Sequence, residues 1–100
     1  IREGFTSDDE LAIFDLLKRD NPNKADIKKL KGTATEMFSK ITEAISKMDH
    51  WADKDETTAE IQNLIRDILW RELPESYDDR LIEICRGDVF EYVYTRYGHV

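Results

Sequence analysis

Hydrophobic residues recur at the spacing of an α-helix through the middle of the chain. Between residues 24 and 48 they fall within an arc of roughly 120° when each residue turns by about 100°. We predict one long amphipathic helix here, beginning after Asn23, and a break near the solvent-facing Gly32 is the alternative. Glu36–Lys40 and Glu43–Lys47 are i, i+4 pairs on its outer face and favour the helix. The apolar residues are Ile27, Leu30, Ala34, Met37, Phe38, Ile41, Ala44, Ile45 and Met48.

A second helical pattern fills residues 54–97 and is interrupted once. Pro74 lacks the N–H that a helix needs, so the first helix is expected to end at Leu73. Ser76 is expected to cap the next helix, with Asp78 and Asp79 in its first turn. Because the connection is short, we predict two antiparallel helices, over residues 54–73 and 77–97. Their apolar residues are Ile61, Leu64, Ile65, Ile68 and Leu69, then Leu81, Ile82, Cys85, Val89, Phe90, Val93 and Tyr97.

The first residues carry the signature of a helix start. Ser7 followed by Glu10 is a capping box, and Phe5 and Leu11 are spaced as a hydrophobic staple. This predicts a short helix over residues 8–19, ended by the segment 21–23. The segment 49–56 is expected to be a polar connection or the first turn of the next helix, with Asp53 and Glu56 as a capping pair. No stretch alternates as a strand does. The fold prediction is therefore all-α: one domain, a bundle of about four helices (8–19, 24–48, 54–73 and 77–97).

Composition agrees with a globular domain. The chain has 100 residues, 40% hydrophobic and 37% charged, and no apolar run long enough to cross a membrane. Cys85 is the only cysteine, so we expect a buried free thiol and a reducing, cytoplasmic location. The chain begins at Ile1 instead of methionine, and we expect it to be the C-terminal piece of a longer protein.

The charge is acidic and uneven. The net charge is −7; residues 1–50 hold nine Lys/Arg and ten Asp/Glu, whereas residues 51–100 hold six and twelve. Acidic surfaces repel phosphate backbones, which argues against a free-standing nucleic-acid-binding protein. One basic cluster is the only candidate for a contact with DNA. Because its residues do not share one narrow side of the helix, a solvated face is the simpler interpretation. Its members are Lys24, Lys28, Lys29 and Lys31.

Candidate catalytic chemistry is sparse. Gly32 stands alone in Lys31-Gly32-Thr33, which has the wrong order for a phosphate-binding loop. The histidines, His50 and His99, are far apart in sequence, and acidic pairs lie at predicted helix starts, where capping explains them better than acid–base catalysis. We therefore expect no catalytic residue, no bound cofactor and no metal site in this chain.

Three side chains are candidates for a protein interface. Trp70 lies about 180° from Ile61 around its helix, beside Arg66, and Tyr94 is placed on the far side of the last helix. Exposed aromatic residues and arginines often anchor protein contacts. The alternative is that Trp70 covers the chain's own first helix or the 49–56 connection.

The order of these pieces resembles the C-terminal end of the R (restriction) subunit of type I restriction–modification enzymes. That family ends a helix in Leu-Pro, places a tyrosine soon after and closes with Val-Phe-x-x-Val-x-x-x-Tyr. The matching positions are Leu73, Pro74, Tyr77, Val89, Phe90, Val93 and Tyr97. The segment 14–17 and the lone Trp51 are similar to the same region, whereas segment 85–88 departs from it and puts the straightness of the last helix in question.

The resemblance implies a role in assembly. The whole R subunit is an ATP- and Mg²⁺-dependent DNA translocase and endonuclease, and its catalytic motifs have no counterpart here. Its C-terminal helical region is thought to hold the motor to the modification and specificity subunits. We expect a docking domain that contacts those subunits and the rest of its own R subunit, reaches DNA only through the complex and does not bind membranes. The alternatives are a DNA-contacting domain of the same motor, or an unrelated helical adaptor.

Overall fold

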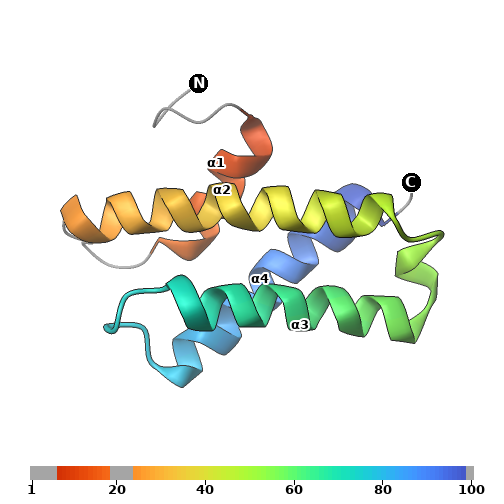
Figure 1. Ribbon diagram of the computed structural model, residues 1–100. Coiled ribbons are helices and arrows are strands. Elements are labelled where there is room, and N and C mark those ends of the chain that lie inside the picture. Colours follow the sequence, from red (N-terminus) through yellow and green to blue (C-terminus); the bar gives the residue numbers. More distant parts are fainter. Residues whose placement is uncertain (1–6, 19–23, 99–100) are drawn as a thin grey trace.

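The chain folds into helices where the hydrophobic pattern predicts them. The computed structural model describes residues 7–18 and 24–98, and these contain no strand. Figure 1 shows α2 and α3 side by side, with α4 crossing behind them and α1 against α2 at the back. The elements are α1 (Asp8–Leu17), α2 (Lys24–Ser46), the 3-10 helix η2 (Trp51–Asp53), α3 (Asp55–Glu72) and α4 (Asp79–Tyr97). The all-α prediction is confirmed.

The start of α1 is the one that the sequence predicts. The N–H of Glu10 donates a hydrogen bond to the Ser7 hydroxyl at 3.2 Å, which satisfies one of the free donors of the first turn. The helix ends at Leu17, two residues earlier than predicted. The staple residue Phe5 and the segment 21–23 lie outside the described residues.

Two other helix starts differ from the prediction. Asp78, not Ser76, caps α4: its carboxylate accepts a hydrogen bond from the N–H of Leu81 at 2.9 Å. The reason is a turn in which the N–H of Tyr77 donates to the Pro74 carbonyl at 2.9 Å, which delays the helix until Asp79. The predicted Asp53–Glu56 pair does not cap α3, because Lys54 occupies the N-cap position without a side-chain hydrogen bond.

The connection between α2 and α3 is a series of hydrogen-bonded turns that leads into the 3-10 helix η2. After Ser46 the chain makes two i→i+3 hydrogen bonds, and His50 then adopts a left-handed conformation with φ of 51°. This conformation is uncommon for residues other than glycine and reverses the chain direction. The Thr57 hydroxyl donates to the Trp51 carbonyl at 2.5 Å and ties the 3-10 turn to α3.

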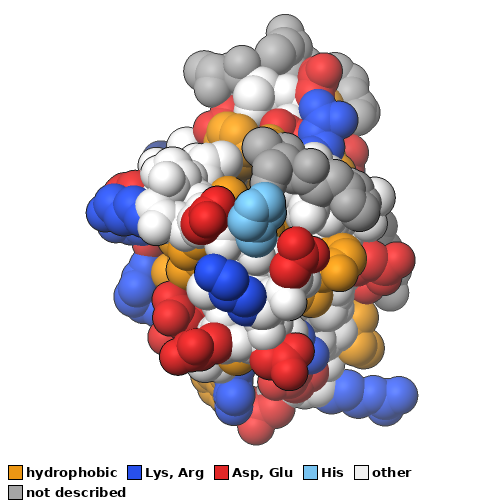
Figure 2. Space-filling view, turned by 90° about the vertical axis from the view of Figure 1, so that its right-hand side faces the viewer, with side chains coloured by type: hydrophobic (Ala, Val, Ile, Leu, Met, Phe, Trp, Pro, Cys, Tyr) orange, Lys and Arg blue, Asp and Glu red, His pale blue; other side chains and the backbone are white. Residues whose placement is uncertain are grey.

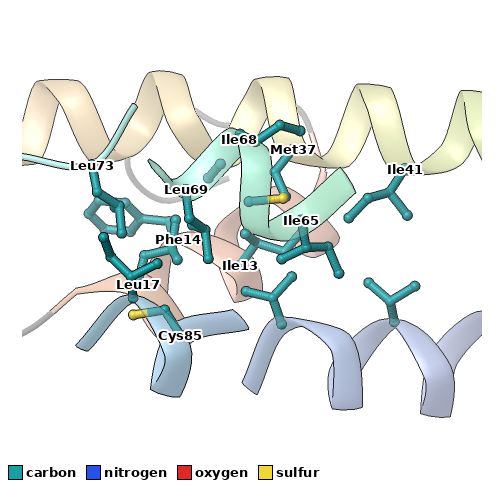
Figure 3. Packing of buried hydrophobic residues seen from close by; sticks show 14 of the residues in the cluster. Ile13, Phe14, Leu17, Met37, Ile41, Ile65, Ile68, Leu69, Leu73 and Cys85 are labelled. Carbon is teal, nitrogen blue, oxygen red and sulfur yellow. The ribbon is translucent and has the colours of Figure 1, made fainter. Parts of the chain in front are cut away.

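Side chains from all four α-helices meet in one core. Figure 3 shows Ile13 of α1, Met37 of α2, Ile65 of α3 and Cys85 of α4 within the same cluster of buried side chains. Each of these side chains is almost completely buried, which confirms that Cys85 is buried, and it forms no disulfide. Burial of such side chains stabilises the fold by about 1.5–3 kcal/mol each.

Neither Gly32 in α2 nor Gly87 in α4 breaks its helix. α2 continues through Gly32, around which a Cβ would meet open space, so the predicted long helix is confirmed and the break is not. α4 likewise runs uninterrupted through Gly87, despite the departure from the family pattern at 85–88.

The exterior carries charges of both signs. Figure 2 shows acidic and basic side chains interspersed over the end of the molecule where α2 passes into α3. None of the helices in the described residues has the length and apolar character to cross a membrane.

Tyr77 ties the turn before α4 to the end of α1. Its ring is buried and its hydroxyl donates to the Leu17 carbonyl at 2.6 Å, across 60 residues of sequence. That carbonyl belongs to the last turn of α1, where intrahelical donors have run out.

We predict that Tyr77→Phe lowers the free energy of unfolding by about 1–2 kcal/mol, because a buried carbonyl loses its donor while the ring stays packed. Chemical denaturation measures this change, provided that the unfolding free energy depends equally steeply on denaturant concentration in the variant and in the parent protein. Tyr94→Phe is the control, since Tyr94 is 40% exposed whereas Tyr77 is buried. Equal stabilities of Tyr77→Phe and the parent protein contradict the prediction.

Candidate protein-interaction site

Trp70 is the most exposed large hydrophobic side chain in the described residues. It projects from the last turn of α3 with 49% of its surface accessible. The alternative, in which α1 or the 49–56 connection covers Trp70, would require this side chain to be buried. The structure leaves it exposed instead. Trp70 keeps the exposure that an interface anchor needs.

Tyr94 is exposed, as the sequence predicts, and it also contacts other aromatic side chains of the chain. It is 40% exposed, yet its ring packs edge-on against Trp51, with the ring centroids 6.0 Å apart, and lies 5.8 Å from Phe90. Such pairs stabilise a fold by about 0.5–1.5 kcal/mol beyond the area that they bury. Tyr94 thus does not stand free on the far side of α4: it covers the 3-10 turn, the role that the sequence analysis offered for Trp70.

Arg66 takes part in an ionic contact between α3 and α4. Its Nε lies 3.8 Å from a carboxylate oxygen of Glu83, which also accepts a hydrogen bond from Arg86 at 2.7 Å. The hydrogen bond from Arg86 lowers the pKa of Glu83. Because the side chains of Arg66 and Glu83 are about half exposed, this contact orients Arg66 more than it stabilises the fold.

The four candidate DNA-contacting lysines lie on the first two turns of α2. Lys24, Lys28 and Lys29 are exposed and Lys31 is half-buried. The structure therefore leaves most of this cluster accessible.

A partly buried polar cluster that the sequence analysis did not predict joins α1 to the end of α4. Asp9 accepts hydrogen bonds from the hydroxyls of Tyr92 and Tyr97, and from Nε of Arg96 at 2.8 Å. Its side chain is only 13% exposed. Asp9 lies in the first turn of α1, where an acidic residue favours the helix start, but its carboxylate also makes a tertiary contact across more than 80 residues of sequence.

The surroundings of Asp9 change its ionisation. Burial by itself raises the pKa of the carboxyl, but hydrogen bonds from both tyrosines and the charge of Arg96 more than offset this, and the pKa falls below its ordinary value of 3.8. Burial and the contact with Asp9 raise the pKa of Tyr92 and Tyr97. The phenols therefore remain protonated donors at neutral pH.

A shallow hollow of about 510 Å³ lies beside this cluster, between α1 and α4. Its charged lining residues are all acidic: Asp15, Asp88 and Glu91. Within residues 7–18 and 24–98, no three His, Cys, Asp or Glu side chains are arranged to hold a metal ion.

We predict that Asp9→Asn lowers the free energy of unfolding by about 1–3 kcal/mol at pH 7, because hydrogen bonds to a charged group are replaced by weaker ones. A carboxyl whose pKa is depressed by folding stabilises the protein above its unfolded pKa and loses that effect as pH falls through the folded pKa. The difference between parent and variant should therefore shrink below about pH 4, as urea denaturation across pH 2–7 will show.

Asp8→Asn is the matched control, since it removes an exposed carboxylate from the same turn of α1 and leaves the cluster intact. Its unfolding free energy should change by a few tenths of a kcal/mol. An Asp9→Asn variant that loses no more stability than Asp8→Asn would rule out the cluster as a stabilising contact.

Comparison with known proteins adds no relative. No protein-family model, no curated protein and no solved structure matches this chain. The resemblance to the R subunit of type I restriction enzymes therefore stays a prediction.

Proposed function

We propose that this chain is a docking domain of the R subunit of a type I restriction enzyme, with no catalytic role of its own. In this proposal it holds the ATP- and Mg²⁺-dependent motor to the methyltransferase core formed by the modification and specificity subunits. It meets DNA only through that complex, in the cytoplasm. The proposal rests on the resemblance in residues 61–97 and on one structural observation, the exposure of Trp70.

The exposure of Trp70 supports docking because it has an energetic cost in the isolated domain. An indole left in water forfeits the free energy of burial, whereas the neighbouring Leu69 and Ile68 on α3 are buried. Tryptophan is also the residue type most enriched among the side chains that dominate binding energy at protein interfaces. A partner that covers Trp70 would recover this free energy.

Two of the motif residues that carry the resemblance, Pro74 and Tyr77, lie just after the turn of α3 that bears Trp70. Pro74 follows the end of α3, and Tyr77 anchors the turn to α1 through its buried hydroxyl. The end of α3 is therefore held rigidly, which reduces the conformational entropy that binding would otherwise cost.

We expect Trp70→Ala to weaken association with the methyltransferase core by at least about tenfold, the loss typical of an interface anchor, without lowering the stability of the domain. Pull-down and calorimetry with the purified core measure the association, and thermal unfolding measures stability. Ile84→Ala is the control, because Ile84 is 44% exposed on α4. Tyr94→Ala should destabilise the domain through loss of the contact with Trp51. No association of the parent domain with the core would end the proposal.

A second candidate function is a contact with DNA through the start of α2. The exposure of Lys24, Lys28 and Lys29 is the observation that favours it. In this alternative the lysines close part of the DNA track of the motor. Phosphate contacts release counterions, so such binding weakens steeply with added salt.

If the lysines contact DNA, the domain should shift duplex DNA in a gel at low salt, and replacement of Lys28, Lys29 and Lys31 by Glu should abolish the shift. Under the docking proposal, the parent domain gives no shift at physiological salt and the triple variant still binds the methyltransferase core. A salt-sensitive shift lost in the variant would favour the DNA role.

A further inference from the structure

A groove runs along the outer side of the α2–α3 pair. Two adjoining hollows of about 390 and 370 Å³ share Ala44, Met48, Glu60 and Leu64 as lining residues, so they form one continuous depression. We call it the α2–α3 groove. α4 crosses behind α2 and α3 in Figure 1, and no helix of the described residues lies over the front of this pair.

The floor of the groove is apolar and incompletely covered. Ala44, Met48 and Leu64 pack against the core, but each is only partly buried. Ala44 lies in the last turn of α2, Met48 in the turn that follows this helix, and Leu64 on α3, so the apolar floor joins the end of one helix to its neighbour. Methionine adapts its shape to different partners.

The two walls of the groove carry different charges. Lys40 on α2 and Lys47 just after its end line one wall, and Glu60 and Asp67 line the other wall on α3. Glu43 also lines the α2 wall, where it pairs with Lys47 at 3.4 Å. Among the described residues no ion pair involves Lys40, Glu60 or Asp67.

Lys40 lacks the partner that the sequence predicts for it. Glu36, four residues before Lys40, forms its ion pair with Arg71 across the α2–α3 interface. This pair bridges the two helices next to the groove. Trp70 is adjacent to Arg71 and one helical turn beyond Asp67, so the exposed indole stands near the same end.

We propose that the α2–α3 groove binds an amphipathic helix of a partner protein, with an apolar seam over Ala44, Met48 and Leu64, a basic flank facing α3 and an acidic flank facing α2. The inference deepens the proposed docking function, on which it rests, by specifying the element of the partner that is recognised.

Charge complementarity supports this occupant. A third helix laid along two antiparallel helices places its flanking residues against the outer side chains of each neighbour, as e and g positions do in coiled coils. Basic residues would meet Glu60 and Asp67, and acidic residues would meet Lys40 and Lys47. From Glu60 to Asp67 the groove spans about 10 Å at 1.5 Å per residue, which suits a contact along about two turns of a helix.

The arrangement of charges also predicts the direction of the bound helix. Reversal of a helix in the groove exchanges its two flanks, so only one direction places a given acidic flank over α2. A second copy of this chain is a weaker occupant, because its acidic net charge opposes self-association.

The test uses two synthetic helices of about 15 residues, stapled because free helices of this length are marginally stable. Peptide A has a leucine seam, lysines on one flank and glutamates on the other; peptide B has the same seam with lysines on both flanks. We expect A to bind about tenfold tighter than B by calorimetry, since several rim charge pairs are each worth up to about 1 kcal/mol. On binding, the changes in amide chemical shift of the domain should concentrate at Ala44, Met48 and Leu64. A version of peptide A with its two flanks exchanged should bind equally well but in the reverse direction.

Charge reversal in the groove provides the matched comparison. Lys40→Glu with Lys47→Glu should invert the preference so that B binds tighter than A, whereas Lys28→Glu with Lys29→Glu, on exposed lysines of the same helix, should leave it unchanged. Equal affinities for A and B, no binding of A, or amide shifts around the α1–α4 hollow would overturn the inference. So would self-association of the domain that is lost in the Lys40→Glu, Lys47→Glu variant.

The same variants separate this inference from the proposed function. Binding of peptide A by a domain that does not capture the methyltransferase core supports the groove and removes the restriction-enzyme role. If the Lys40→Glu, Lys47→Glu variant captures the methyltransferase core as well as the parent domain does, the result is the reverse. The docking function is then supported, and the α2–α3 groove is not the docking site.

Discussion

The structure depends on how the short helix α1 is held at both of its ends. Ten residues are too few for a stable helix in water, so α1 relies on tertiary contacts. At its start Asp9 binds the end of α4, and at its end the Leu17 carbonyl accepts the Tyr77 hydroxyl just before α4 begins. Between these contacts Ile13 and Phe14 insert into the core. α1 is thereby tied to the end of α4 and to the turn just before α4 begins, so the helical hairpin α3–α4 keeps one position relative to α2.

Much of this architecture can be predicted from the sequence because it follows from local rules. Apolar residues at helical spacing locate α2 and α3 to within two residues, and Pro74 ends α3 where its missing N–H requires. The cap at Ser7 is equally local. Predictions failed where a tertiary contact competes with a local one: burial of Tyr77 draws the chain into a turn, and the cap of α4 moves from Ser76 to Asp78.

The candidate site is less predictable for the same reason. Periodicity identifies Trp70 as lying opposite the buried face of α3, and the structure leaves it exposed. Periodicity alone cannot show that Tyr94 packs against Trp51, that Asp9 contacts the end of α4, or that Glu36 pairs with Arg71 instead of Lys40. Each of these pairs joins different elements, so it depends on how the helices pack. The groove itself exists only once α2 and α3 lie side by side.

The burial of Cys85 gives this fold a built-in probe of its own opening. Its thiol lies fully inside the core on α4, and it is the only cysteine in the sequence. A thiol-specific reagent can reach it only when the helices separate locally or globally, so the rate of alkylation measures the population of open states. Because a ligand of the folded state lowers that population in proportion to its occupancy, alkylation kinetics will report binding anywhere on the outside of the molecule without any added label.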